Sequence, residues 1–363
     1  MVGTAIAPSL SGIVANKNIG FSPGWLITLP ALGVVLFAPL VGRLLPKLGT
    51  IKLLSFGLVP YALFGWIGAF ISSDFLLIID RILLGAATVA IQVSVTAYIA
   101  EFYSGKERMK MIAWQGMAIE SGGVVFLAVS GFLCEINWQL PFYIYLLALL
   151  CFVFVRQILP RPDQNTENNI EPLVPNQNAK PRVRLIFLAS LLAMMLFFVG
   201  IVTLPLYLPQ SFAFGESETG YFMAFISVVA IVTASQIPRM VNILGDEKTV
   251  AFGLLLFSVA YLVFAISASI PFIILSGIFM GTGFGFTIPL LNHMMLETSS
   301  LKNQGKNLGL YSMGVFGGQF LSTFINYISG NYMVIYTVAA VLALLITMVI
   351  YLLFQQLQKR PNG

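Results

Sequence analysis

The chain has 363 residues, of which 58% are hydrophobic and 9% are charged, and its mean hydropathy is +0.92. A chain with so few charges cannot cover its apolar side chains in water, so this composition excludes a soluble globular protein and indicates a lipid bilayer. The net charge of +5 is explained by membrane topology and gives no reason to expect nucleic-acid binding. With two cysteines and one histidine, the sequence predicts no disulfide framework, metal site or cofactor.

Eleven apolar segments are long enough to cross the hydrocarbon core, which takes about 20 helical residues. In chain order they lie near 25–42, 53–72, 76–99, 111–134, 141–160, 185–207, 220–238, 249–268, 270–292, 308–330 and 332–355. A membrane barrel would instead show segments of about 10 residues with alternating apolar and polar side chains. The predicted fold class is therefore all-α, a polytopic membrane protein.

The second half of the chain repeats the first. The segment from Gly42 to Lys52 recurs at Pro238 to Lys248, with Arg, Gly and Lys in register at an offset of 245 − 49 = 196. Three further residues share this offset, since Gly24, Gly85 and Glu101 map onto Gly220, Gly281 and Glu297. Parallel duplication in a membrane protein is typical of transporters with a site between the halves. We therefore expect two pseudo-symmetric six-helix bundles, at 1–160 and 185–363.

The amino-terminal apolar segment, Met1 to Ala15, is too short to cross the bilayer. Its equivalent in the second half begins near Arg184, so the offset places its expected start at 184 − 196 = −12. We expect a truncated or misassigned start that leaves the first helix incomplete. A signal peptide is a poorer explanation, because no basic residue precedes the apolar run.

Residues 161–184, between the bundles, are polar, proline-rich and poor in aromatic side chains, which predicts a flexible cytoplasmic linker. If the loop after the second span is cytoplasmic, Lys17 alone lies outside and Arg81 alone lies within a span. The other basic residues, 19 − 2 = 17, are then cytoplasmic. The positive-inside rule predicts a multi-pass protein of the plasma (inner) membrane with a cytoplasmic carboxyl terminus.

The repeated segments carry residues expected at a cytoplasmic gate. These are Gly42, Arg43, Lys47, Gly49 and Lys52 in the first half and Arg239, Gly245 and Lys248 in the second. Their spacing resembles the signature between helices two and three of the major facilitator superfamily, although Pro46 stands where the family has an Asp. The resemblance covers nearly the whole chain. It implies a twelve-helix secondary transporter that works by alternating access, with proton coupling.

The fourth helix also resembles the family, because an Arg precedes a Gly by four residues near its start. Residues at helical spacing from this Arg form one stripe, namely Arg81, Gly85, Thr88, Gln92 and Thr96. A charged side chain facing lipid costs about 2.5–3.5 kcal/mol, so we expect the stripe to face the substrate pathway. Interhelical hydrogen bonding is the structural alternative. Asp80 is turned from Arg81 by about 100° on the helix, so the two need not share a partner.

Glu120 is the main candidate for proton coupling, and Asp80 is the second. A carboxyl group near mid-membrane favours its neutral form and can load and release a proton near neutral pH. The same helix face carries Gly116, Gly123 and Gly131, so a close-packed, structural Glu120 is an equal alternative. Depth separates Glu120 from Arg81 by roughly 13 Å, so we expect no direct pair between them.

In the second half, the predicted wall of the pathway is a polar face of the eleventh helix, made of Gln319, Ser322 and Asn326. The tenth helix is rich in glycine. Its glycines indicate either a bendable gate helix or plain close packing: Gly277, Gly281, Gly283 and Gly285.

The sequence favours a secondary transporter of a small organic solute. Proton-coupled efflux of an amphipathic compound is the preferred version, because the spans offer mainly aromatic, amide and hydroxyl groups. Uptake of a small nutrient, or of an anion held by Arg81, is the alternative.

A non-transporting membrane sensor or scaffold is the alternative of another class, supported by the altered signature at Pro46. An enzyme is not expected, because one histidine and scattered carboxylates form no acid–base constellation. The expected partners are the solute, protons and lipid, and the expected state is a monomer.

Overall fold

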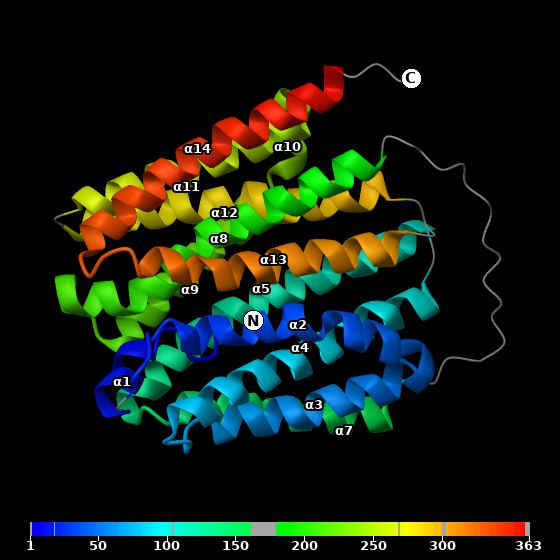
Figure 1. The fold of residues 1–363 in the computed structure, drawn as a ribbon, viewed down its shortest axis with the longest axis horizontal. Helices are drawn as coiled ribbons and strands as arrows, with labels where there is room; N and C mark the ends of the chain where they lie inside the picture. Colours follow the sequence, from blue (N-terminus) through cyan, green and yellow to red (C-terminus); the bar gives the residue numbers. More distant parts are fainter. Residues whose placement is uncertain are drawn as a thin grey trace. The chain divides into compact units, whose positions relative to one another are not determined.

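The structure is a computed structural model, drawn as a ribbon in Figure 1, and it describes residues 2–17, 19–103, 105–160, 179–267, 269–299 and 303–359. These residues form helices joined by turns and short loops, and no strand occurs among them. The elements in chain order are α1 (Leu10–Asn16), α2 (Trp25–Leu48), α3 (Thr50–Ile67), α4 (Asp74–Phe102), α5 (Gly105–Ile136), α6 (Leu140–Tyr143), η1 (Ile144–Leu146), α7 (Leu147–Gln157), α8 (Ala179–Phe212), α9 (Glu216–Ala234), α10 (Ile237–Leu244), α11 (Asp246–Ile266), α12 (Ile270–Thr298), α13 (Gln304–Asn326) and α14 (Tyr332–Lys359).

Within the described ranges, eleven helical stretches are long and apolar enough to cross a membrane. They run from Trp25–Leu48 near the amino end to Tyr332–Gln358 near the carboxyl end, and each overlaps a predicted span. The prediction of an all-α, polytopic membrane protein is therefore confirmed. α1 adds a helix of only 7 residues, and turns precede it.

The chain forms two compact units. The first comprises Met1–Ile170 with Gly215–Tyr221, and the second comprises Glu171–Phe214 with Phe222–Gly363. The start of α9 therefore belongs to the first unit, whereas the sequence predicted all of residues 185–363 in the second bundle. α8 begins at Ala179, inside the segment 161–184 expected as a linker, and residues 161–178 of that segment lie outside the described residues.

The offset of 196 is repeated in the backbone geometry. Gly49 joins α2 to α3 with φ 76° and ψ 164°, and Gly245 joins α10 to α11 with φ 81° and ψ 165°. Residues with a Cβ rarely adopt such a positive φ, so both helix junctions require glycine. The glycine of each repeated segment therefore serves the same turn in each unit.

Helix packing repeats as well. A Cβ added to Gly57 of α3 would lie 3.2 Å from the carbonyl oxygen of Ala87 on α4. A Cβ added to Gly253 of α11 would lie 2.9 Å from the carbonyl oxygen of Gly283 on α12. Because 57 + 196 = 253 and 87 + 196 = 283, each unit crosses its equivalent helices at the same point, with a small residue where the backbones approach.

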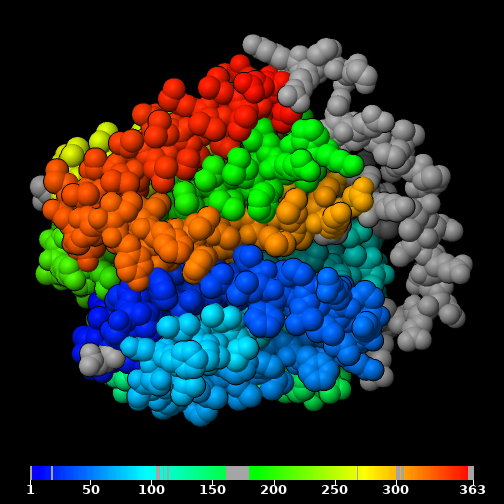
Figure 2. Space-filling view, in the orientation of Figure 1, coloured from blue at the N-terminus to red at the C-terminus, as the bar shows by residue number. Residues whose placement is uncertain are grey.

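The carboxyl-terminal helix α14, red in Figure 2, shows how a span divides its apolar side chains. One face is exposed and carries Val341, Leu345, Met348 and Leu352. The other face carries the buried Tyr336, Ala343 and Phe354 and packs on α11 and α8. Both faces are apolar, as expected of a helix with protein on one side and lipid on the other.

Candidate functional site

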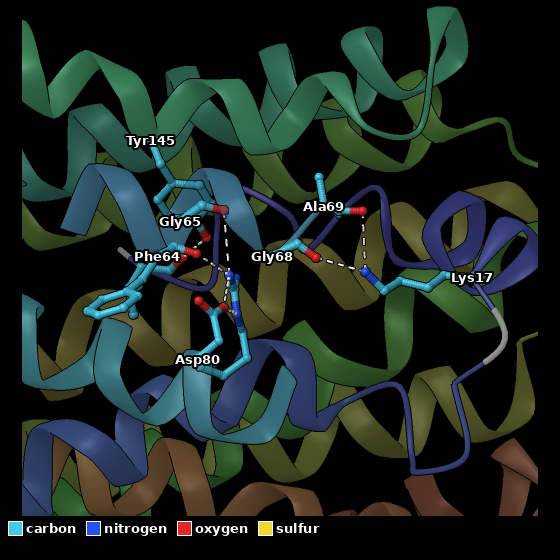
Figure 3. A network of polar contacts seen from close by, with 9 residues as sticks. Lys17, Phe64, Gly65, Gly68, Ala69, Asp80 and Tyr145 are labelled. Atoms are coloured by element: carbon cyan, nitrogen blue, oxygen red, sulfur yellow. Dashed lines mark hydrogen bonds and ion pairs between the residues drawn. The ribbon is translucent and has the colours of Figure 1, made fainter. Parts of the chain in front are cut away.

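Arg81 of α4 is fully buried in the first unit. Its Nε and Nη2 donate to Oδ2 of Asp80 at 2.9 and 2.6 Å, which makes an ion pair between neighbouring residues. Nη2 also donates to the carbonyl oxygen of Phe64 at 2.7 Å (Figure 3). The desolvation cost of two buried charges is offset by the carboxylate and by a backbone acceptor.

Lys17, which follows α1, reaches the end of α3 in the same network (Figure 3). Its Nζ donates to the carbonyl oxygens of Gly68 at 2.8 Å and Ala69 at 3.3 Å. Together with Arg81 it places two cations at the carboxyl end of α3, where unpaired carbonyl groups and the helix dipole favour positive charge. Burial, and then the charge of Arg81, lower the pKa of Lys17 to about 8, while Asp80 acts in the opposite direction.

Aromatic rings lie beside both cations. The ring centroid of Phe142 is 5.8 Å from Cζ of Arg81, and that of Trp138 is 5.9 Å from Nζ of Lys17. Rings at this distance add a favourable electrostatic attraction to the burial of each cation. In the described part of the chain, Nη1 of Arg81 has no hydrogen-bond partner that meets ordinary geometry, although the side chain of Tyr145 interacts with the guanidinium.

Beyond the buried Gly85, the predicted stripe on α4 is only partly buried. Oγ1 of Thr88 donates to a carbonyl oxygen one turn earlier in its own helix at 2.8 Å. Nε2 of Gln115, on α5, donates to Oγ1 of Thr96 at 3.3 Å. Gln92 lies between them along the helix. The stripe therefore divides into a closed ion pair at Arg81 and a more open polar segment farther along α4.

Glu120 lies on the face of α5 that packs inward. The residues that follow it on this face are buried, namely Gly123, Leu127, Ser130 and Cys134. Glu120 itself is partly exposed, and no hydrogen bond or ion pair joins its carboxylate to another residue of the described ranges. The ion pair that the structure gives to Arg81 is with Asp80.

The space along α5 differs between its two ends. A Cβ added to Gly131 would lie 2.3 Å from the carbonyl oxygen of Glu216, so this glycine permits a close backbone contact. A Cβ added to Gly116 would have no described atom within 4 Å. Of the three glycines expected to pack closely, Gly131 does so and Gly123 is buried, whereas no described atom contacts a Cβ at Gly116, one turn from Glu120.

The three residues of the predicted polar face on α13 have different surroundings. Oγ of Ser322 is buried and donates to the carbonyl oxygen of Gln319 at 2.6 Å. Asn326 is partly buried, and neither polar atom of its side chain has a hydrogen-bond partner within the described ranges. Gly314 and Gly318 of the same helix press on the backbone of α8. One edge of α13 is thus a packing edge, and Asn326 is the polar group with unused capacity.

The glycines of α12 are packing positions. A Cβ added to Gly281 would lie 2.5 Å from the carbonyl oxygen of Ile226, and one added to Gly285 would lie 2.6 Å from that of Ala230. Both contacts are with α9. The contacts therefore favour the packing interpretation of this glycine-rich helix over the bendable gate.

The predicted gate residues lie at the helix ends that carry the repeat. Their basic side chains are exposed, namely Arg43, Lys47, Lys52, Arg239 and Lys248. Gly42 has open space around it, and Gly49 and Gly245 form the two turns already described. Nearby, Oγ1 of Thr50 donates to Oε2 of Glu101 at 2.9 Å, which ties the start of α3 to the end of α4.

Sequence reasoning missed three participants in these contacts. Lys17 was expected only as an outer-loop residue, Gln115 was not singled out, and Tyr145 donates unexpectedly to the carbonyl oxygen of Val2 at 2.6 Å. Lys17 alone carried a signal, because it was the one basic residue on the side that the positive-inside rule leaves nearly free of positive charge.

The sequence profile of the Major Facilitator Superfamily matches residues 1–323 and, in a second match, residues 186–362. The chain is 24% identical to tetracycline resistance protein, class B, of Escherichia coli, over 83% of this chain and 77% of that protein. It is 21% identical to multidrug resistance protein 2 of Bacillus subtilis (strain 168), over 79% of this chain and 73% of that protein. Its fold is similar to the crystal structure of a D-xylose-proton symporter, with a TM-score of 0.76 at 16% identity, covering 96% of this chain and 93% of that one.

The profile match extends over most of the chain, and the spans and the repeated helix packing agree with it. The chain therefore belongs to the Major Facilitator Superfamily, and it is a membrane transporter of a small solute, not an enzyme.

Proposed function

We propose that the protein is a secondary active transporter that exports an amphipathic organic solute in exchange for protons. The names of the Escherichia coli and Bacillus subtilis relatives, which describe resistance to tetracycline and to multiple drugs, support export. The composition of the spans supports an amphipathic solute, because aromatic, amide and hydroxyl groups are common there and charges are few. Family membership favours this reading over a sensor or scaffold that transports nothing.

The observation that carries the proposal is the difference between two intramembrane carboxylates. Asp80 is 5% exposed and accepts two hydrogen bonds from Arg81. Glu120 has open space at Gly116 and, among the described residues, no hydrogen-bonding partner. A proton carrier needs enough burial to favour its neutral form and enough access to exchange the proton. Glu120 meets both needs, and Asp80 serves instead to neutralise Arg81.

In this proposal the solute contacts the partly exposed polar groups of α4 and the polar face of α13. The pathway residues are Arg81, Thr88, Gln92, Thr96, Gln319, Ser322 and Asn326. Arg81 is fully buried in this conformation, so its Nη1 contacts the solute only in a conformation that opens this part of the first unit. The exposed basic residues of the repeated segments form the cytoplasmic gate. The protein acts as a monomer in the plasma membrane, with its carboxyl terminus inside.

A second candidate is uptake of a small anion. One observation favours it, since a buried guanidinium whose Nη1 has no hydrogen-bond partner of ordinary geometry among the described residues is suited to a carboxylate or phosphate. The two candidates differ in direction, in the charge of the solute and in the membrane orientation in which accumulation occurs.

Transport into oriented membrane vesicles distinguishes the candidates. Export predicts that inside-out vesicles with an acidic interior accumulate tetracycline or another amphipathic drug, and that a protonophore abolishes the accumulation. Uptake predicts accumulation of an anion in right-side-out vesicles. Vesicles without the protein are the control. Drug accumulation that persists after the proton gradient has collapsed would contradict proton exchange, and the absence of accumulation in inside-out vesicles would contradict export.

A further inference from the structure

A hollow of about 640 Å³ opens at one end of the second unit. It lies where α8 and α11 end and α14 begins. Its lining is aromatic and polar, with Tyr207, Phe212, Phe264, Tyr332, Gln210 and Ser267 as the main side chains, and no charged residue of the described ranges lines it. Its volume is within the range of small-molecule sites in proteins, roughly 300–1,000 Å³.

Aromatic rings give the hollow its floor and walls. Tyr207 and Phe264 are buried, whereas Phe212 and Tyr332 are partly exposed. The ring of Tyr207 meets that of Phe212 at 5.6 Å and 75°, and that of Tyr332 at 5.3 Å and 62°. Oη of Tyr332 donates to Oε1 of Gln210 at 3.1 Å, which holds the outer ring in place. Aromatic rings therefore line the hollow, and ring faces attract cations.

More carbonyl ends than amide ends of helices lie at the hollow. α8 ends at Phe212 and α11 ends at Ile266, so the carbonyl ends of two helices meet there, and carbonyl ends carry partial negative charge. α14 begins at the same place with its amide end, which would oppose them. Oδ1 of Asn331, however, accepts the backbone N–H of Met333 at 2.9 Å and so satisfies one of the leading donors of α14. Backbone and rings therefore both favour a positive ligand.

The first unit shows what occupies the equivalent place there. Nζ of Lys17 donates to the carbonyl oxygens of Gly68 and Ala69, beside the ring of Trp138. The offset of 196 maps Gly68 onto Phe264 and Ala69 onto Ala265, and both of these line the hollow. It maps Lys17 onto Ala213, an exposed residue next to Phe212. At the duplicated helix end, the carbonyl oxygen of Phe264 accepts hydrogen bonds from Oη of Tyr207 at 3.4 Å and Oγ of Ser267 at 3.0 Å, and no ammonium group of the described ranges lines the hollow. The aromatic neighbours also differ, because the offset maps Trp138 onto Val334 and the rings of the hollow come from α8, α11 and α14.

We propose that the hollow binds an organic cation with an aromatic body, whose ammonium group takes the place that Nζ of Lys17 fills in the first unit. The carbonyl oxygen of Ala265, at the end of α11, accepts a hydrogen bond from it, and the rings of Tyr207, Phe212 and Tyr332 contact its apolar part. An organic anion of the same shape should bind more weakly, because no cationic side chain of the described ranges lines the hollow. This site is independent of Glu120 and of the direction of transport.

Binding of three probes of one shape to the purified full-length protein tests the proposal. The probes are 4-phenylbutylammonium, 4-phenylbutanol and 4-phenylbutanoate, which share a phenyl group on a short alkyl chain and carry a cationic, a neutral and an anionic head group. Equilibrium dialysis measures their affinities. We expect the ammonium to bind about tenfold or more tightly than the alcohol, and the carboxylate to bind most weakly. Equal affinities, or no binding of the ammonium, would overturn the proposal.

A variant with a lysine at the proposed position of the ammonium group tests whether the probe binds in the hollow. Ala213→Lys should place its own Nζ at the end of α11, as Lys17 does at the end of α3, and should reduce affinity for 4-phenylbutylammonium about tenfold. Ala213→Met is the matched control, because it has nearly the same length, no charge and the same backbone requirement at φ 56°. The control should keep wild-type affinity, and both variants should elute as folded protein. Unchanged binding in Ala213→Lys would refute the site.

Discussion

Replacing Asp80 with Asn should destabilise the first unit by about 3–5 kcal/mol, because it leaves a buried guanidinium without its counter-charge. Arg81 is 0% exposed, so water cannot take over the role of the carboxylate. Two charge-assisted hydrogen bonds, of 2.9 and 2.6 Å, are weakened, and only the backbone acceptors remain at full strength. Asp74→Asn is the control, since Asp74 is partly exposed and accepts the N–H of Gly20; we expect less than about 1 kcal/mol there.

A double-mutant cycle shows whether the loss comes from the unpaired charge. Asp80→Asn, Arg81→Gln and the double variant are purified in mild detergent, and their unfolding free energies are compared by titration with a denaturing detergent. Because the double variant contains no unpaired charge, it should be more stable than Asp80→Asn alone. If the two single losses simply add in the double variant, the residues are not coupled and the buried ion pair is refuted.

Three further predictions follow from contacts in the first unit. Gly85→Ala should lower the yield of folded protein, because its Cβ would meet the carbonyl oxygen of Pro30 on α2. The control Gly116→Ala should fold normally, because no described atom lies within 4 Å of its Cβ. Equal yields of the two variants would contradict the close helix crossing at Gly85. Between pH 8 and pH 10.5, Lys17 has lost its proton in the folded protein but keeps it in the unfolded chain. The unfolding free energy of the wild type should therefore rise with pH across this range more than that of Lys17→Gln. Parallel pH curves of the two proteins would contradict the lowered pKa. Arg81→Lys keeps the charge but loses the planar set of donors, so transport should fall at normal expression; wild-type transport in Arg81→Ala would exclude a role for this residue in the pathway.

The spans and the duplication could be predicted from the sequence, because a span depends on a local apolar stretch and the duplication on residues that recur at a fixed offset. A span needs only a continuous apolar stretch of sufficient length, and its register along the chain is insensitive to what surrounds it. The repeat of Gly49 at Gly245 was visible as an offset, and the positive φ at both positions explains why glycine stands at both.

The pairing within the candidate site could not be predicted in the same way. Neighbouring helical positions point about 100° apart, so helical geometry gave no reason to pair Asp80 with Arg81. The long Arg side chain turns back to its neighbour because the end of α3 offers further acceptors, and that end is 17 residues away in the chain. The partnership of Lys17 with the same helix end also depends on tertiary packing.

The roles of glycines were likewise decided by packing. Gly116 and Gly131 share one face of α5 in the sequence, yet the structure packs a backbone against Gly131 and leaves Gly116 open. Periodicity identifies a face but not which part of that face another helix covers. The open part contains Glu120, so the difference between the two glycines bears directly on whether this carboxylate can exchange a proton.

The central claim is that Glu120 carries the coupled proton, and one comparison of two variants tests it most directly. Glu120→Gln keeps the shape and hydrogen-bonding capacity of the side chain but cannot titrate, and Glu120→Leu removes both. We predict that Glu120→Gln abolishes proton-driven accumulation in inside-out vesicles while solute binding and downhill exchange remain measurable. If Glu120 has only a structural role, the opposite result is expected. Glu120→Gln would then lose little proton-driven accumulation, and Glu120→Leu would lower the yield of folded protein. Intact proton-driven accumulation in Glu120→Gln would contradict the account.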